Sequence, residues 1–173
     1  MKKILIITLM VLCAFLLQSS VFSYLEFAGI IPNIMIILTA SFGFMRGEKT
    51  GLLVGFFCGL LSDIFFGPVI GLYSLIYMYI GFLNGLFSRL FYPHDIKLPL
   101  VLISFSDLLY SFTCYFIFFV LRSRFAFEYY FLHIILPELF YTILVTLVLY
   151  PVILFINNRL DPKEVKGSDI DFV

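Results

Sequence analysis

Three carboxylic acids lie inside apolar stretches of this sequence, at Asp63, Asp107 and Glu138, and the same stretches contain no Lys or Arg. Each acid must therefore be protonated, hydrogen-bonded to a hydroxyl, amide or backbone group, or matched by a cation that a partner or ligand supplies. For Asp107 and Glu138, a structural hydrogen-bonding role and a ligand-binding or coupling role are both open. Asp63 either belongs to a functional site or caps or braces a helix end, and the bracing role is compatible with a partner site.

Motifs for catalysis and metal binding are absent from the sequence. It contains no Gly-x-Ser-x-Gly, no His-Glu-x-x-His and no phosphate-binding loop. His94 and His133 have no second His or Cys at metal-ligand spacing. Cys13, Cys58 and Cys114 are odd in number and lie in apolar runs, so we interpret them as small core residues. We expect no catalysis, no metal and no cofactor.

The composition indicates an integral membrane protein. Hydrophobic residues make up 62% of the 173 positions and charged residues only 13%, whereas soluble proteins carry roughly 25% charged residues. The formal net charge is zero, so nucleic acid is not an expected partner. At about 20 residues per span, the chain holds about six helices. The predicted fold class is therefore all-α, a polytopic bundle of about six transmembrane helices in one domain.

Six apolar stretches supply the predicted spans. The first follows Lys2 and Lys3 and resembles a signal peptide, but no small-x-small cleavage site follows it, so we expect an uncleaved span. Pro32 is expected in the first turn of the second span, where its missing N–H is tolerated. A polar tail, residues 157–173, is expected after the last span. The predicted spans are residues 4–24, 30–45, 50–66, 71–91, 98–121 and 131–156.

The basic residues predict the orientation. With six spans, only Arg122 and Arg124 face outward, and the remaining basic residues face the cytoplasm. Short cytoplasmic loops are enriched in Lys and Arg, so both termini are expected in the cytoplasm. The residues placed on that side are Lys2, Lys3, Arg46, Lys49, Arg89, Lys97, Arg159, Lys163 and Lys166.

The third span carries glycines at every fourth position, and the next steps of four reach Asp63 and Gly67. Small residues at this spacing let another helix approach closely in a membrane, and close packing alone would explain them. The fourth span repeats the spacing at Gly81 and Gly85, so it is a candidate partner for the third. The glycines of the third stretch are Gly47, Gly51, Gly55 and Gly59.

Polar residues form one stripe on each of the last two spans. Ser104, Asp107, Ser111 and Cys114 share one helical face of the fifth span. On the sixth span, Glu138 begins a similar stripe that continues through Thr142, Thr146 and Tyr150. Both stripes are expected to face the interior of the bundle.

The run from residue 31 to residue 73 resembles the core of the rod shape-determining protein MreD family. That family's pattern is a Pro-Asn or Pro-Asp that opens a helix, an Arg-Gly turn, a Gly-x-x-x-Gly helix ending in Gly-Leu-x-x-Asp, and a Gly-rich outer turn before Gly-Leu. The chain length, the six spans and Pro151 in the last helix also fit. The matching positions are Pro32, Asn33, Arg46, Gly47, Gly51, Gly55, Gly59, Leu60, Asp63, Gly67, Gly71 and Leu72.

The resemblance implies a multi-pass component of the bacterial cytoplasmic (inner) membrane. It would belong to the elongasome, which controls cell shape and peptidoglycan synthesis, and would act with MreC, an MreB filament, RodA and a penicillin-binding-protein synthase. It implies no catalysis, and it implies a fold similar to the substrate-binding subunits of energy-coupling-factor vitamin transporters. On this basis we hypothesise that the glycine groove and Asp63 receive the single transmembrane helix of an MreC-like partner.

A second hypothesis belongs to a different functional class. The chain would be the binding subunit of a small-solute carrier, with Asp107 and Glu138 lining the solute pocket. A third, an intramembrane hydrolase, requires a nucleophile that the sequence does not identify.

Overall fold

The computed structural model describes residues 2–21, 31–90, 96–118 and 127–160, and these residues are helical apart from short connections, with no strand among them. Three of the described helical segments are long and apolar enough to cross a membrane: Glu48–Phe66, Lys97–Phe118 and Glu128–Arg159. The large exposed side chains are apolar on most helices, as at Leu53 and Phe105. An apolar outer surface of this extent indicates lipid rather than water as the surrounding solvent.

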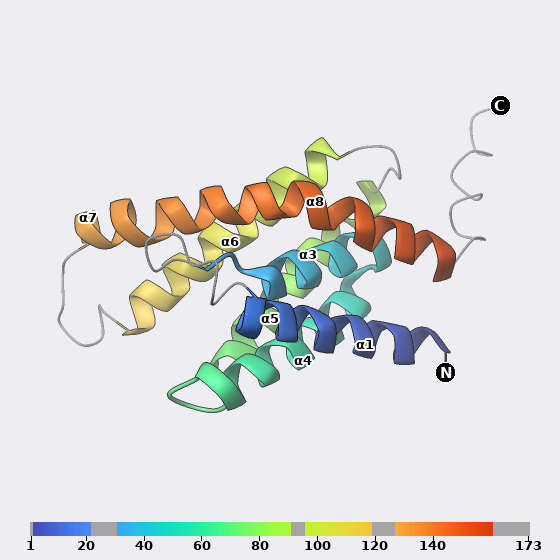
Figure 1. Ribbon diagram of the computed structural model, residues 1–173, viewed down its shortest axis with the longest axis horizontal. Helices are drawn as coiled ribbons and strands as arrows, with labels where there is room; N and C mark the ends of the chain where they lie inside the picture. Colours follow the sequence, from blue (N-terminus) through green and yellow to red (C-terminus); the bar gives the residue numbers. More distant parts are fainter. Residues whose placement is uncertain (1, 22–30, 91–95, 119–126, 161–173) are drawn as a thin grey trace.

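Each of the six predicted apolar stretches contains a helix. The number of membrane crossings itself stays a prediction. In chain order the elements are α1 (Lys2–Leu16) with a π-helical turn η1 (Leu17–Val21), α3 (Ile34–Arg46), α4 (Glu48–Phe66), α5 (Leu72–Leu86) with a 3-10 turn η2 (Phe87–Leu90), α6 (Lys97–Phe118), and α7 (Phe127–Tyr130), which continues through a π-helical turn η4 (Phe131–Ile135) into α8 (Leu136–Leu160) (Figure 1).

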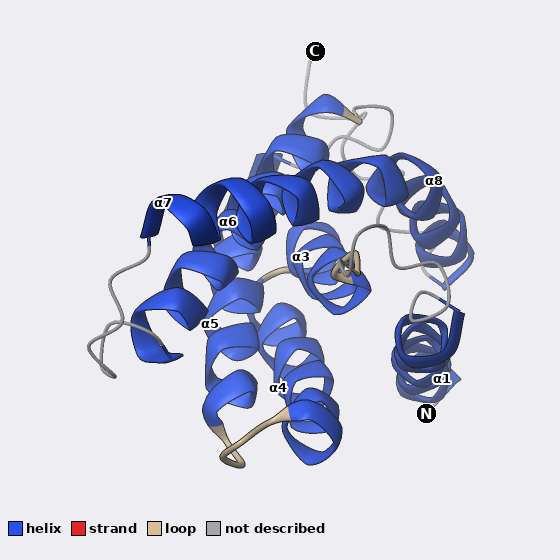
Figure 2. Cartoon of the chain, turned by 60° about the vertical axis from the view of Figure 1, so that its left-hand side comes forward, coloured by secondary structure: helices blue, strands red, loops and turns tan. Residues whose placement is uncertain are grey.

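Helix α3 occupies the centre of the bundle. Every residue from Ile34 to Met45 is buried, as expected for a helix that is apolar around its whole circumference. It contacts α1, α4, α5, α6 and α8, and Figure 2 shows it nearly end-on, with α4 and α5 on one side and α8 on the other. The other helices are thus positioned by their contacts with α3.

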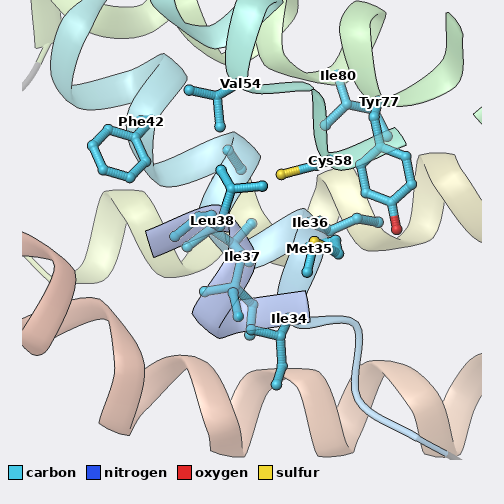
Figure 3. Close-up of a cluster of buried hydrophobic side chains, with 14 of the residues drawn as sticks. Ile34, Met35, Ile36, Ile37, Leu38, Phe42, Val54, Cys58, Tyr77 and Ile80 are labelled. Atoms are coloured by element: carbon cyan, nitrogen blue, oxygen red, sulfur yellow. The ribbon is translucent and has the colours of Figure 1, made fainter. Parts of the chain in front are cut away.

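The main apolar core lies where α3 meets α4 and α5. Ile36 of α3 lies close to Cys58 of α4 and Tyr77 of α5, with Val54 and Ile80 beside them (Figure 3). Cys58 has no exposed surface and Tyr77 is 1% exposed. Interiors of this kind are packed so closely that adding or removing one methyl group changes the stability of the fold.

Two predicted helix boundaries were wrong. Helix α3 begins at Ile34 with Asn33 as its N-cap, so Pro32 precedes the cap and does not lie in the first turn. The last helical segment begins at Phe127 and ends at Leu160, so residues 157–160, expected in the tail, are helical. The π-helical turn η4 ends two residues before Pro137, and Leu136 N–H bonds to the Phe131 carbonyl there. Because proline cannot donate and crowds the preceding turn, such a local rearrangement is expected.

Several sequence-based expectations concern residues outside the described ranges. They are His94, Arg122 and Arg124, and the tail from residue 161 onward.

Candidate functional site

Helices α4 and α5 pack backbone against backbone. A Cβ atom at Gly51 would overlap the carbonyl group of Gly81, and one at Gly81 would overlap the carbonyl group of Gly51. Gly55 lies against the Tyr77 carbonyl and Gly59 against the backbone of Ser74 in the same way. The prediction that the two glycine-spaced helices are partners is confirmed, because only residues without a side chain permit this approach.

The close packing extends to α3 through three further glycines. Gly47 alone links α3 to α4, with a φ of +89°, and Gly85 lies against the backbone of Gly47 and Glu48. A Cβ at Gly43 would lie 2.6 Å from the Gly81 carbonyl oxygen. Gly43 was not among the predicted packing residues, although it precedes Gly47 by the same four-residue step.

This arrangement contradicts the hypothesis that a partner helix enters the glycine groove. Along α4, from Gly51 to Gly59, the groove is filled by α5 of the same chain. Two helix backbones cannot occupy one groove, so an incoming transmembrane helix must use another surface. The glycines therefore serve helix packing within the chain.

Asp63 caps the helix that follows its own. Its carboxylate accepts hydrogen bonds from the backbone N–H groups of Gly71 at 2.9 Å, Tyr73 at 2.8 Å and Ser74 at 2.9 Å, and from the Ser74 hydroxyl at 2.5 Å. The first N–H groups of a helix have no partner within it, and the helix dipole favours a negative charge there. Gly71, the N-cap residue of α5, has no side chain to do this and adopts a φ of +105°.

Asp63 is 1% exposed, and its carboxylate is engaged by α5 of the same chain. The bracing role expected from the sequence is therefore present, although the helix end that Asp63 braces is the start of α5. At the end of α4, the Asp63 carbonyl also accepts a hydrogen bond from Gly67 N–H at 3.1 Å. One residue thus fixes the whole turn from Gly67 to Gly71.

Asn33 joins three helices at the start of α3. Its Oδ1 accepts from Ile36 N–H at 3.3 Å and from the Tyr77 hydroxyl of α5 at 2.9 Å. The interaction of its backbone N–H with Thr142 Oγ1 of α8 spans 3.2 Å. The side chain is 4% exposed, so each of these bonds is made away from water and is costly to lose. The Pro-Asn element of the sequence therefore fixes where α3 begins relative to α5 and α8.

At the opposite end of α3, Arg46 Nε donates to Asn157 Oδ1 of α8 at 2.6 Å. A further cross-helix bond runs from Asn84 Nδ2 of α5 to Ser106 Oγ of α6 at 2.7 Å. Ser106 was not part of the predicted stripe. Residues of the Arg-Gly and Pro-Asn elements thus hold α3 at both of its ends.

Asp107 differs from Asp63 because its carboxylate is not engaged. It is 1% exposed, and neither of its oxygens has a hydrogen-bond partner in the described part of the chain, although the Thr142 hydroxyl faces it. Glu138 lies close enough for electrostatic repulsion with Asp107, and its Oε2 is 3.4 Å from the Ser111 hydroxyl. The prediction that the polar stripes face inward is confirmed, with Ser104 and Glu138 only half-buried.

The thiols and imidazoles form no reactive cluster in the described ranges. No group of three or more His, Cys, Asp or Glu residues there could hold a metal ion. Cys58 and Cys114 are buried as expected, but Cys13 is exposed, so its interpretation as a core residue was wrong. His133 stacks on the Tyr129 ring, with centroids 4.4 Å apart.

A cavity of about 210 Å³ lies between η1, α4, α5 and α6, and its polar lining residues are Gln18, Ser62, Tyr73, Tyr77 and Tyr110. Neither acid that the carrier hypothesis assigned to a solute pocket is among its lining residues. Its volume is also below the roughly 300–1,000 Å³ typical of sites for drug-sized ligands. The cavity therefore does not support a vitamin-sized solute.

The apolar exterior, the three long apolar helices and the buried polar contacts define a helical membrane protein. The chain belongs to the MreD family, because the family model for the rod shape-determining protein MreD matches residues 1–159. The match confirms the resemblance found in residues 31–73, extends it over most of the chain, and supports a role in determining rod shape. No curated protein matches the chain. No solved structure matches it either, so the similarity in fold to energy-coupling-factor subunits stays a prediction.

Proposed function

We propose that this protein is a non-catalytic membrane component of the bacterial cell-elongation complex. In this role it links an MreC-like single-span protein, an MreB-like filament, and the RodA and penicillin-binding-protein synthases of peptidoglycan. The family match over residues 1–159 carries the proposal. The buried polar contacts around Asn33 and Asp63 support it, because they stabilise one arrangement of α3, α4, α5 and α8, as a scaffold requires.

The proposed location is the bacterial inner membrane, with six spans and both termini in the cytoplasm. The distribution of Lys and Arg and the helix found in each predicted stretch support this topology. Reporter fusions that are active only in the cytoplasm should be active at both ends of the chain. Activity at one end alone would require an odd number of spans.

The partner helix is proposed to pack on the outward stripe of α5, formed by Leu75, Tyr79, Leu83 and Leu86, which are all exposed. Tyr79 is 58% exposed and lies halfway along α5, roughly 10 Å from either end. A hydroxyl at this depth faces hydrocarbon unless another helix supplies a hydrogen bond, and such bonds between helices support association. The outward stripe thus replaces the glycine groove as the proposed docking surface.

Affinity capture with site-specific crosslinking tests this function. A photoreactive amino acid at Tyr79 should crosslink to an MreC-like protein in living cells, and mass spectrometry of gently extracted complexes should identify wall synthases. The matched control is the same amino acid at Phe105 of α6, which is 63% exposed and should give no such crosslink. Capture of ATPase subunits instead would favour the solute-carrier function.

A further inference from the structure

An open apolar groove of about 420 Å³ runs between α1 and α4. Its walls include Ile7, Val11 and Leu12 of α1, and Leu53, Phe57 and Leu60 of α4. Arg46 and Thr50 line the end where α3 turns into α4. We call this the α1–α4 groove. None of the contacts described above fills it.

The length of the α1–α4 groove matches one leaflet of a bilayer. Along α4 it extends from Thr50 to Leu61, which is roughly 16 Å at the helical rise, about half of the roughly 30 Å hydrocarbon core. Near the far end of α4, the ring of Phe15 packs against Phe65 and Phe66, with centroids 4.8 and 6.0 Å apart. The groove therefore begins where α3 turns into α4 and extends about half-way across the membrane.

The length of the groove fits a lipid chain and not a transmembrane helix. A spanning helix packs along the full thickness of the bilayer, whereas the groove extends over roughly 16 Å of α4. A single acyl chain is narrow enough to enter and requires only one leaflet.

The charged end of the groove selects the headgroup. Arg46 lines the groove there while its Nε donates to Asn157, and Lys49 is exposed in the next turn, beside the exposed Glu48. A run of charged residues at the end of two apolar helices belongs at the level of the lipid headgroups. Cations at this level attract anionic lipids.

We propose that the α1–α4 groove binds one acyl chain of an anionic glycerophospholipid, whose phosphate lies beside Arg46. The inference goes beyond the proposed function and requires none of the proposed protein partners. It requires only that the charged turn lies at a membrane surface, on whichever side.

The chain contains no Trp, so a single introduced Trp can report on nearby lipid. Leu12→Trp and, separately, Leu53→Trp place the reporter on the two walls of the groove. Val148→Trp is the control, at a site in the middle of α8 that is 69% exposed. Each variant is reconstituted in phosphatidylcholine with increasing brominated phosphatidylglycerol, and quenching is compared with that by brominated phosphatidylcholine.

A preference for the anionic lipid of about fivefold is expected at both groove positions, the magnitude that one cation near the membrane surface provides. Val148→Trp should show none. Adding Arg46→Gln, which keeps an amide donor for Asn157, should reduce the preference at the groove to the control value. The proposal is overturned if groove and control positions show equal preference. Weaker quenching in the groove than at the control also overturns it, because protein and not lipid would then fill the groove.

Discussion

Gly51→Ala separates the two forces that act on the glycine-packed helices. Replacing an interior glycine by alanine favours the helix by about 1 kcal/mol when nothing opposes the methyl group. At Gly51, however, the new Cβ would overlap the Gly81 carbonyl oxygen and lie only 2.7 Å from the Cα of Gly43 and 2.8 Å from the Gly81 carbonyl carbon. All three atoms belong to backbone, so no side chain can rotate away.

The steric effect should exceed the gain in helix propensity. Forcing an extra methyl group into a closely packed core costs about 1–3 kcal/mol, and a backbone obstacle on two helices places Gly51 at the upper end. After subtraction of about 1 kcal/mol for propensity, Gly51→Ala should lower the free energy of unfolding by about 2 kcal/mol. For a chain of this size that corresponds to a fall in Tm of roughly 4–8 °C.

Buried thiols provide the assay. In a Cys13→Ser background, Cys58 and Cys114 are the remaining thiols and both are buried, so the rate of maleimide labelling during heating in mild detergent follows unfolding. Leu53→Ala, at a site 57% exposed on the same helix, is the control and should shift the midpoint little. A midpoint for Gly51→Ala at or above that of the parent would refute the reasoning, because propensity alone would then decide the outcome.

Four further outcomes follow from the structure. Gly51→Ala combined with Gly81→Ala should lower the free energy of unfolding by less than the sum of the single changes. Once the first methyl group has moved the helices apart, the second overlaps less with the opposite backbone; strict additivity in the same assay would argue against direct contact. Asp63→Ala should lower stability by about 3 kcal/mol or more, because it leaves several backbone donors without an acceptor, and an unchanged midpoint would disprove the cap. Thr142→Val should lower the free energy of unfolding more than Tyr77→Phe does. The first change leaves Asn33 N–H without its acceptor, whereas after the second Asn33 Oδ1 still accepts from Ile36 N–H; the reverse order would contradict the assigned bonds. Asp107→Asn should not reduce stability, because neither carboxylate oxygen has a hydrogen bond to lose among the described residues, and a large fall in its midpoint would reveal a structural role.

The sequence predicted those parts of the fold that depend on residue type and periodic spacing. The glycine steps in α4 and α5 predicted their mutual packing, since small residues recur on one face of each helix. The stripe of Thr142, Thr146 and Tyr150 predicted an inward face, and all three residues are buried. The start of α3 at Ile34 could also have been predicted from Asn33, because asparagine is favoured at the N-cap of a helix.

Other features could not be obtained from the sequence for physical reasons. Spacing identifies a face for close packing but does not say whether a partner helix can share it, so the sequence allowed both α5 and a partner helix at Gly51 and Gly55. The donors to Asp63 are mostly backbone N–H groups, which every residue except proline possesses. The α1–α4 groove could not be predicted, because apolar side chains cover both the interior and the exterior of a membrane protein. Hydrophobicity therefore does not distinguish buried residues from residues that line an open groove.

The central claim is tested most directly by deleting the gene for this chain from the bacterium that encodes it and measuring cell width and length. The role in rod shape predicts that the deleted cells widen and become round, and that the wild-type chain expressed from a plasmid restores rods. Asp63→Ala, which destabilises the bundle, should restore them poorly at an equal level of expression. Cells that keep normal width and length through many generations without the chain would contradict the account.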